Sequence, residues 1–124
     1  MLKKIMIVDD SKIMRLVIRR TLRQAGFDDF EMVEADDGRE AIDVYERERP
    51  DLVLADWDMP VMGGLELLRH LRAFDPQVRL GFVTSEQSPE SRTTARQAGA
   101  RFLITKPFTP NDFKLTLDLM MRVG

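Results

Sequence analysis

Five predicted strands alternate along the chain with five predicted helices. The strands cover residues 4–8, 30–35, 52–55, 78–83 and 101–105; most are short apolar runs, whereas 30–35 alternates between apolar and polar residues. The helices cover residues 13–25, 41–45, 65–71, 89–97 and 113–120; apolar residues recur at helical spacing in all of them except 89–97, which is predicted from Pro89 at its first position. Because each connection is short, we expect the strands to lie parallel and the helices to cover both faces of one sheet through right-handed crossovers. The pattern predicts an α/β fold.

The length of the chain favours one of two arrangements of such a sheet. Rossmann and flavodoxin-like orders are both compatible with alternating strands and helices. Five strands within 124 residues favour the flavodoxin-like order, a doubly wound five-stranded parallel sheet with strand order 2-1-3-4-5 and five helices. We expect residues 1–124 to form one domain, because no linker or repeat interrupts the chain and 44% hydrophobic residues suffice for a packed core.

Composition argues against several classes of function. The net charge of -2 gives no electrostatic basis for direct binding to nucleic acid or to a membrane surface. The chain contains no cysteine, which excludes disulfides, thiolate metal sites and cysteine nucleophiles. No apolar run approaches the ~18 residues that cross a membrane, and the N-terminus does not resemble a signal peptide. We therefore expect a cytoplasmic protein.

Polar side chains follow four of the five predicted strands. Asp9 and Asp10 follow the first strand, Asp56 the third, Thr84 the fourth and Lys106 the fifth. In a flavodoxin-like sheet, ligands bind outside the carboxyl ends of the strands, where the strand order reverses. We expect three acids, a hydroxyl and an ammonium group to share one crevice at that edge.

Three carboxylates in one crevice indicate a bound cation. Neighbouring carboxylates repel one another, and Mg²⁺ in proteins typically takes one or two carboxylates and keeps water ligands. The alternative is that these acids cap the helices that follow the strands, as Asp10 or Ser11 and Asp36 could. Capping does not explain Lys106, so we favour a Mg²⁺ site.

The same groups suit phosphoryl transfer, in which positioning and the neutralisation of oxygen charge do most of the work. A carboxylate can act as the nucleophile and form an acyl phosphate. We expect Asp56 to have this role, with Mg²⁺ bridging Asp56 and one phosphoryl oxygen. Lys106 would pair with a second oxygen, and Thr84 would donate a hydrogen bond to the third.

These residues resemble the receiver domain of two-component response regulators, close to the single-domain chemotaxis-type members. The resemblance covers essentially the whole chain and rests on five motifs, namely Asp9-Asp10, Asp56 with Met59-Pro60, Gly63-Gly64, Thr84-Ser85 and Lys106-Pro107-Phe108. It implies that a histidine kinase or a phosphotransfer protein phosphorylates Asp56. The surface of the fourth and fifth strands and the fourth helix would then change, and a downstream protein target, which the sequence does not identify, would recognise it.

The resemblance also implies how the acids share the metal. Asp10 and Asp56 would be Mg²⁺ ligands, Asp9 would help through water, and the backbone carbonyl of Asp58 would be a further ligand. The protein would not be an enzyme with a separate substrate, because it would catalyse only its own phosphorylation and dephosphorylation.

Two further residues have roles that the resemblance implies. Lys106 and Thr84 would sense the phosphoryl group, and the Lys106-Pro107 peptide bond would be cis.

Two positions depart from the family pattern. Leu103, three residues before Lys106, stands where receivers often carry an aromatic switch residue. Asp58 stands where many chemotaxis-type members have Asn, and it adds negative charge beside the phosphoryl site. We expect Asp58→Asn to alter the lifetime of the phosphorylated protein.

Other families share parts of this pattern. The Asp56-Trp-Asp58 segment also matches the Asp-x-Asp motif of haloacid-dehalogenase-type phosphatases, although those enzymes carry the motif on an early strand. A calcium loop fails because Pro60 occupies the next ligand position and no Gly follows at the sixth. A receiver fragment of a larger regulator with an effector domain, and a structural domain with a degenerate site, remain alternatives.

The first and fourth helices carry charged and polar residues outside their apolar positions. On the first helix these are Arg15, Arg19, Arg20 and Arg23, which we interpret as solvated surface because the overall charge is near neutral. The fourth helix has little apolar surface, so we expect it to be held loosely.

Overall fold

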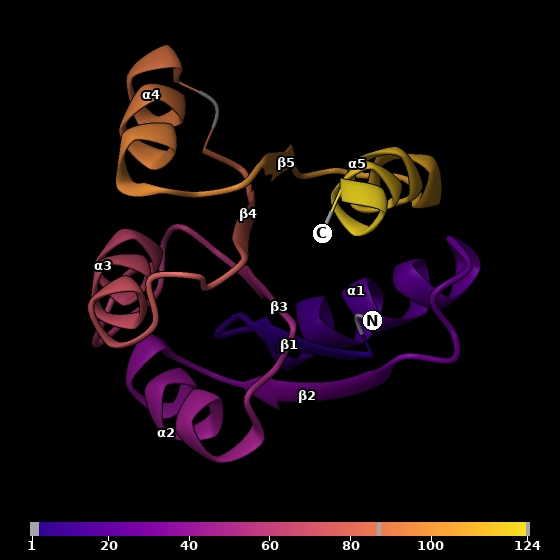
Figure 1. Cartoon of the computed structure of the whole chain (residues 1–124). Coiled ribbons are helices and arrows are strands. Elements are labelled where there is room, and N and C mark those ends of the chain that lie inside the picture. Colours follow the sequence, from indigo (N-terminus) through magenta and orange to yellow (C-terminus); the bar gives the residue numbers. More distant parts are fainter. Residues whose placement is uncertain (1–2, 87, 124) are drawn as a thin grey trace.

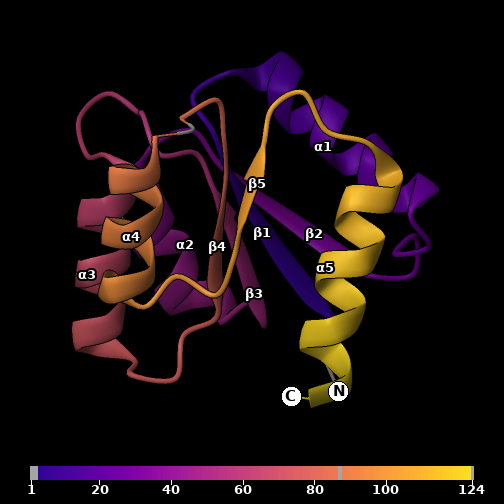
Figure 2. The same cartoon turned by 90° about the horizontal axis from the view of Figure 1, so that it is seen from above.

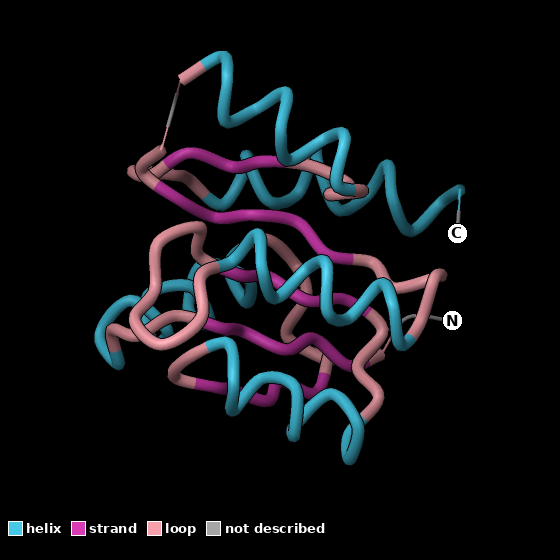
Figure 3. Tube along the Cα trace, turned by 90° about the vertical axis from the view of Figure 1, so that its left-hand side faces the viewer, coloured by secondary structure: helices cyan, strands magenta, loops and turns pink. Residues whose placement is uncertain are grey.

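The sheet has the strand order β2-β1-β3-β4-β5 in the computed structural model, which describes residues 3–86 and 88–123. Its strands are β1 (Lys4–Val8), β2 (Glu31–Ala35), β3 (Leu52–Ala55), β4 (Leu80–Thr84) and β5 (Leu103–Thr105). All neighbouring strands pair in parallel. Figure 3 shows the strands side by side with helices on both sides. The predicted flavodoxin-like α/β sheet is confirmed.

Helices cover both faces of this sheet. They are α1 (Lys12–Gln24), α2 (Gly38–Glu48), α3 (Gly64–Phe74), α4 (Pro89–Ala98) and α5 (Pro110–Val123). Figures 1 and 2 show α1 and α5 on one face and α2, α3 and α4 on the other. Within the described part of the chain, no helix combines the length and apolarity needed to span a membrane.

Side chains of β1 alternate between two apolar cores, one on each face of the sheet. Met6 and Val8 belong to the core beneath α2 and α3, whereas Ile5 and Ile7 belong to the core beneath α1 and α5. All four side chains are fully or almost fully buried. Burial on both faces explains why the central strands β1, after Lys4, and β3 are continuous apolar runs without polar alternation.

The helix caps show which polar residues are committed to local structure. Ser11 Oγ accepts a hydrogen bond from the Met14 amide at 3.1 Å and caps α1. Asp37 Oδ1 accepts from the Glu40 amide at 2.8 Å and caps α2. Of the candidate caps weighed from the sequence, Ser11 is confirmed, whereas neither Asp10 nor Asp36 caps a helix. The carboxylate of Asp10 is therefore not used for capping.

Two strands begin two residues later than predicted, and β2 begins one residue later, at Glu31. β4 begins at Leu80 because the Val78 amide donates to the Asp75 carbonyl at 3.0 Å and closes a turn instead. β5 begins at Leu103 rather than at residue 101. The apolar character of Val78, which is 4% exposed, reflects burial in the core and not strand pairing.

Helix α4 begins at the predicted residue and ends one residue later than predicted. Ser88 is its N-cap, Pro89 is its first residue, and Gly99 at φ 104° is its C-cap. Only Ala95 among its side chains is buried, in agreement with its polar sequence. Gln87, which precedes the N-cap in the sequence, lies outside the described residues.

Candidate functional site

Asp9, the residue after β1, is held by four hydrogen bonds. Its amide donates to the Ala35 carbonyl at 3.2 Å, and its own carbonyl accepts from Arg15 Nη1 at 2.5 Å. Its carboxylate accepts from the Ser11 amide at 2.9 Å and from Lys106 Nζ at 3.1 Å. Asp9 is 2% exposed, so these contacts fix a buried carboxylate at the carboxyl end of the sheet.

Asp56 follows β3 directly and lies at the same edge. Its amide donates to the Val8 carbonyl at 3.0 Å, which continues the pairing of β3 with β1. Its Oδ2 accepts from Lys106 Nζ at 3.3 Å. A Cβ at Gly64 would lie only 2.3 Å from the Asp56 carbonyl oxygen. Glycine thus lets the start of α3 pack against the end of β3.

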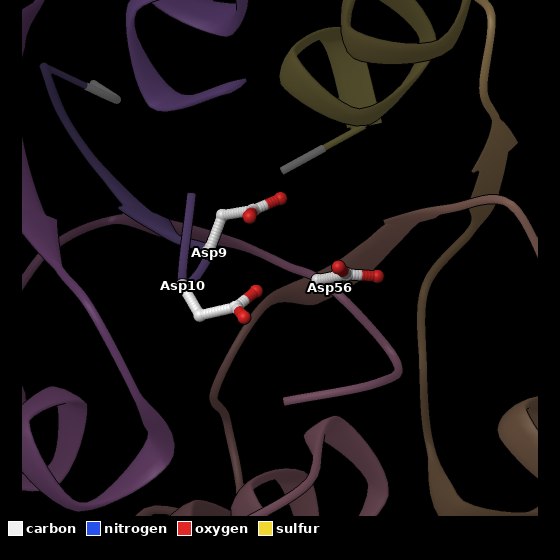
Figure 4. A group of neighbouring side chains, drawn as sticks. All are labelled: Asp9, Asp10 and Asp56. Atoms are coloured by element: carbon white, nitrogen blue, oxygen red, sulfur yellow. The ribbon is translucent and has the colours of Figure 1, made fainter. Parts of the chain in front are cut away.

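Asp10 completes a cluster of three carboxylates. Asp9, Asp10 and Asp56 each offer a carboxylate oxygen, and these oxygens lie within 4.8 Å of one another. Figure 4 shows the side chains of Asp9 and Asp10 extending toward the side on which Asp56 lies. Asp10 is exposed, and its carboxylate accepts no hydrogen bond from any residue that the structure describes. Its oxygens are available to a ligand.

Lys106 follows β5 and is the cation that faces this cluster. Partial burial acts to lower the pKa of Lys106, but the hydrogen bond that Lys106 donates to Asp9 and the negative charge of Asp56 outweigh it and raise the pKa above its ordinary value. The lysine is therefore fully protonated at neutral pH. Its single ammonium contacts two of the three acids, so the crevice keeps excess negative charge.

Thr84 is the last residue of β4 and lies beside Lys106. Its carbonyl accepts from the Lys106 amide at 2.9 Å, and its side chain is buried. Its Oγ1 accepts from the Glu86 amide at 3.2 Å. Because the hydroxyl is the acceptor in that contact, its own proton can be donated to a ligand in the crevice.

The residues that depart from the family pattern lie at the margin of the site. The side chain of Asp58 is exposed and is not part of the carboxylate cluster. Its predicted role as a ligand through the backbone carbonyl stays a prediction. Leu103 is partly buried and packs on the core beneath α2 and α3, where it presents no ring toward Thr84. The Lys106-Pro107 bond is cis, as expected.

Reasoning from the sequence missed a second group of charged residues next to the cluster. Arg15 and Arg19 are not solvated surface, because both bind Glu34 of β2, at 2.8 Å and 2.9 Å. Their side chains are 13% and 26% exposed, whereas Arg20 and Arg23 are exposed as expected. The signal in the sequence was Glu34, an acid near the carboxyl end of β2 that the neighbouring arginines of α1 could pair with.

The donor set of the crevice fits a hard divalent cation. It consists of three carboxylates, of which Asp10 has no partner among the described residues, against one ammonium. Mg²⁺ binds oxygen ligands of this type and keeps several waters, which suits an exposed carboxylate at the rim. Asp9, Asp10 and Asp56 are the residues that could hold it.

Comparisons with known proteins agree with this geometry. Residues 5–118 match the response regulator receiver domain family. The chain is 39% identical over 117 residues to the chemotaxis protein CheY-3 of Vibrio cholerae, covering 93% of this chain and 88% of that protein. It is 38% identical over 124 residues to the chemotaxis protein CheY homolog of Campylobacter jejuni, covering 98% and 94%.

Solved structures share the fold over the full chain. The structure of Vibrio cholerae chemotaxis protein CheY4 matches with a TM-score of 0.83 and 32% identity, and all of both chains is covered. A CheY-like receiver domain protein from Methanospirillum hungatei matches with a TM-score of 0.83 and 31% identity, again with all of both chains covered.

Proposed function

Because the chain belongs to the response regulator receiver domain family, we propose that Asp56 accepts a phosphoryl group and that the phosphorylated protein signals through protein contacts. One observation carries this proposal. Three carboxylates, a protonated lysine and a threonine hydroxyl lie at the carboxyl edge of the sheet, at the ends of four strands. The cluster combines a nucleophile with groups that can bind phosphoryl oxygens.

Asp56 is placed to act as the nucleophile. Its side chain is 12% exposed, so one face is open to the crevice, while the Lys106 contact orients the carboxylate. A carboxylate oxygen forms a bond to phosphorus as the bond from phosphorus to the donor nitrogen breaks, and the leaving imidazole takes up a proton. The product is an acyl phosphate on Asp56.

Lys106 and Thr84 bind the transferred group. The ammonium of Lys106 can turn from Asp56 Oδ2 to a phosphoryl oxygen without leaving Asp9, because it already contacts both acids. Thr84 donates its hydroxyl proton to another phosphoryl oxygen. Mg²⁺, when bound by Asp9, Asp10 and Asp56, supplies positive charge that offsets the charge of the phosphoryl oxygens.

The change at Thr84 and Lys106 would reach an exposed surface through β4, β5 and α4. Thr84 is paired with Thr105 in the sheet, and Lys106 donates its amide to Thr84. α4 buries one side chain, Ala95, so few core contacts oppose its displacement. A downstream protein that binds the displaced form would shift the population toward it.

The phosphodonor in this proposal is a histidine kinase or a phosphotransfer protein, encountered in the cytoplasm. The protein is not a multiple-turnover enzyme and acts only on its own phosphoryl group. The phosphatase alternative is disfavoured because its Asp-x-Asp motif would need Asp58 as a general acid, and that side chain is exposed outside the carboxylate cluster.

The test is incubation with Mg²⁺ and acetyl phosphate, followed by measurement of the intact mass. We expect the wild type to gain one phosphoryl group and Asp56→Asn to gain none. Asp58→Asn is the matched control, because it removes the neighbouring aspartate and should leave phosphorylation in place. Equal phosphorylation of the wild type and Asp56→Asn, or no phosphorylation of either, would contradict the proposal.

A second assay separates signalling from phosphatase activity. The protein is incubated with small phosphate esters and Mg²⁺, and released inorganic phosphate is measured over time. We expect no release beyond one equivalent. Steady release over many equivalents would favour the phosphatase alternative.

A further inference from the structure

Arg15 of α1 connects the carboxylate cluster to the neighbouring strand β2. We propose that Arg15 is a positioning residue: by fixing the peptide between Asp9 and Asp10, it holds the Asp10 carboxylate in the orientation that binds a divalent cation. This inference rests on the proposed function for its metal, whereas its geometric part concerns the metal-free protein.

The guanidinium of Arg15 makes two bonds in different directions. Nη1 donates to the Asp9 carbonyl at 2.5 Å, and Nε donates to Glu34 Oε1 at 2.8 Å. The side chain is 13% exposed, so both bonds are shielded from water on most sides. A planar guanidinium can serve two acceptors at once with little loss of freedom per bond, whereas a lysine ammonium is a point charge on a flexible stem.

Glu34 is itself held, so Arg15 has a fixed support. Its second carboxylate oxygen accepts from Arg19 Nη1 at 2.9 Å. Glu34 lies on β2, opposite Ile7 in the pairing of β2 with β1. The unit Arg15–Glu34–Arg19 therefore ties α1 to the sheet two residues before Asp9.

Asp10 depends on the contacts of Arg15 because its own carboxylate has no hydrogen-bond partner among the described residues. Its carboxylate accepts no hydrogen bond from the described residues, and its side chain is exposed. The carboxylate of Asp9, by contrast, is bound to Ser11 and Lys106. The carbonyl that Arg15 binds belongs to the peptide plane that leads into Asp10. Fixing that plane fixes the position of the Asp10 Cα and so limits the directions in which the Asp10 side chain can leave the backbone.

Charge and positioning predict opposite effects for Arg15. A guanidinium near a cation site repels the cation, so removing its charge alone should strengthen cation binding. Removing the support of a metal ligand should weaken it, typically by tenfold or more. The sign of the measured change therefore separates the two.

The first measurement is Mg²⁺ affinity, followed by the fluorescence of Trp57, which is the only tryptophan and is adjacent to Asp56. We expect Arg15→Ala to weaken Mg²⁺ binding by about tenfold. Arg15→Lys, which keeps the charge, should recover part of that loss. Arg20→Ala is the matched control, since Arg20 is exposed on the same helix, and it should bind as the wild type does. Unchanged or tighter binding by Arg15→Ala overturns the proposal.

The second measurement needs no metal. Amide hydrogen exchange over residues 9–12 should be faster in Arg15→Ala than in the wild type or Arg20→Ala, while exchange in β3 and β4 stays the same. Unchanged exchange at residues 9–12 overturns the positioning role whatever the Mg²⁺ result. If the wild type binds no Mg²⁺, the proposed function and the metal part of this inference both fail. Faster exchange would then still show that Arg15 orders the segment.

Discussion

The two ends of the sheet differ in whether their carboxylates have partners within the protein. At the amino ends of the strands the acids have partners within the protein. Asp51 accepts from the Lys3 and Lys4 amides, both at 2.9 Å, and Glu48 accepts from Lys4 Nζ at 3.0 Å. Asp75 accepts from the Tyr45 hydroxyl at 2.7 Å. These contacts join the start of the sheet to the ends of α2 and α3.

At the carboxyl ends of the strands, one lysine faces a cluster of three acids. Lys106 binds Asp9 and Asp56, and Asp10 has no partner among the described residues. At the amino ends of the strands, the hydrogen bond from Tyr45 lowers the pKa of Asp75. Acids that have hydrogen-bond or ion-pair partners within the protein contribute to its stability. Acids that exceed the available partners can bind a cation or accept a phosphoryl group.

The largest effect that would test this contrast is expected for Lys106→Ala. The substitution leaves Asp9 and Asp56 without their shared cation, and we expect the free energy of unfolding without Mg²⁺ to fall by about 3 kcal/mol. Urea denaturation measures the loss, and added Mg²⁺ should restore part of it by binding the folded protein. Lys114→Ala is the control, because its pair with Asp118 is exposed and should cost less than about 0.5 kcal/mol. Equal losses would contradict the contrast.

Asp10→Asn should separate function from stability. Mg²⁺ affinity should fall by about tenfold, because a charged ligand is replaced by a neutral one. Stability without Mg²⁺ should stay the same or rise, since one source of repulsion is gone. Asp51→Asn should do the reverse, costing about 1 kcal/mol and leaving Mg²⁺ affinity unchanged. A loss of stability in Asp10→Asn as large as that in Asp51→Asn would show that the two ends do not differ.

Tyr45→Phe tests only the amino-terminal end of the sheet, where the acids have partners within the protein. Loss of the hydrogen bond to Asp75 should lower the free energy of unfolding by about 1 kcal/mol, with no change in Mg²⁺ affinity. Burial, followed by the contact with Asp75, raises the pKa of Tyr45 above its ordinary value of 10.0. The folded state thus holds this proton more tightly than the unfolded state. The contribution of the Tyr45 proton to the free energy of unfolding is complete below pH 10 and is lost as the pH rises toward the folded-state pKa.

The measurement that checks this prediction is the dependence of the free energy of unfolding on pH. Urea denaturation of the wild type between pH 9 and pH 11 should show stability falling as the pH rises, and Tyr45→Phe should show a smaller fall. Identical pH profiles would mean that the raised pKa of Tyr45 does not contribute to the stability of the folded protein.

Asp58→Asn is expected to have the smallest effect. Its side chain is exposed and lies outside the carboxylate cluster, so solvent and salt screen its charge. Mg²⁺ affinity should fall by about twofold, through the loss of one nearby negative charge. At saturating Mg²⁺ the lifetime of the phosphorylated protein should also change, as followed by the decay of radiolabelled phosphate. A lifetime identical to that of the wild type would remove any role for this carboxylate.

Much of the fold and the main site residues follow from local sequence pattern. Runs such as Leu52–Ala55 are buried on both faces and therefore lack polar alternation, and the polar residue that follows each strand lies at the strand end. Parallel pairing then brings Asp9, Asp56 and Lys106 to one edge without any knowledge of side-chain contacts. The starts of β4 and β5 were less predictable, because buried apolar residues such as Val78 look alike inside and outside a strand.

The sequence by itself indicated the order of the strands, the edge at which the acids meet and the lysine that faces them, because these follow from the number of strands, the chain length and the direction of parallel strands. Only the tertiary structure decided which charged residues are satisfied. Ser11 and not Asp10 caps α1, and Arg15 turns inward to the Asp9 carbonyl and Glu34. Such pairings join residues of different elements, and their free energies depend on burial and distance, which helical or strand periodicity does not specify.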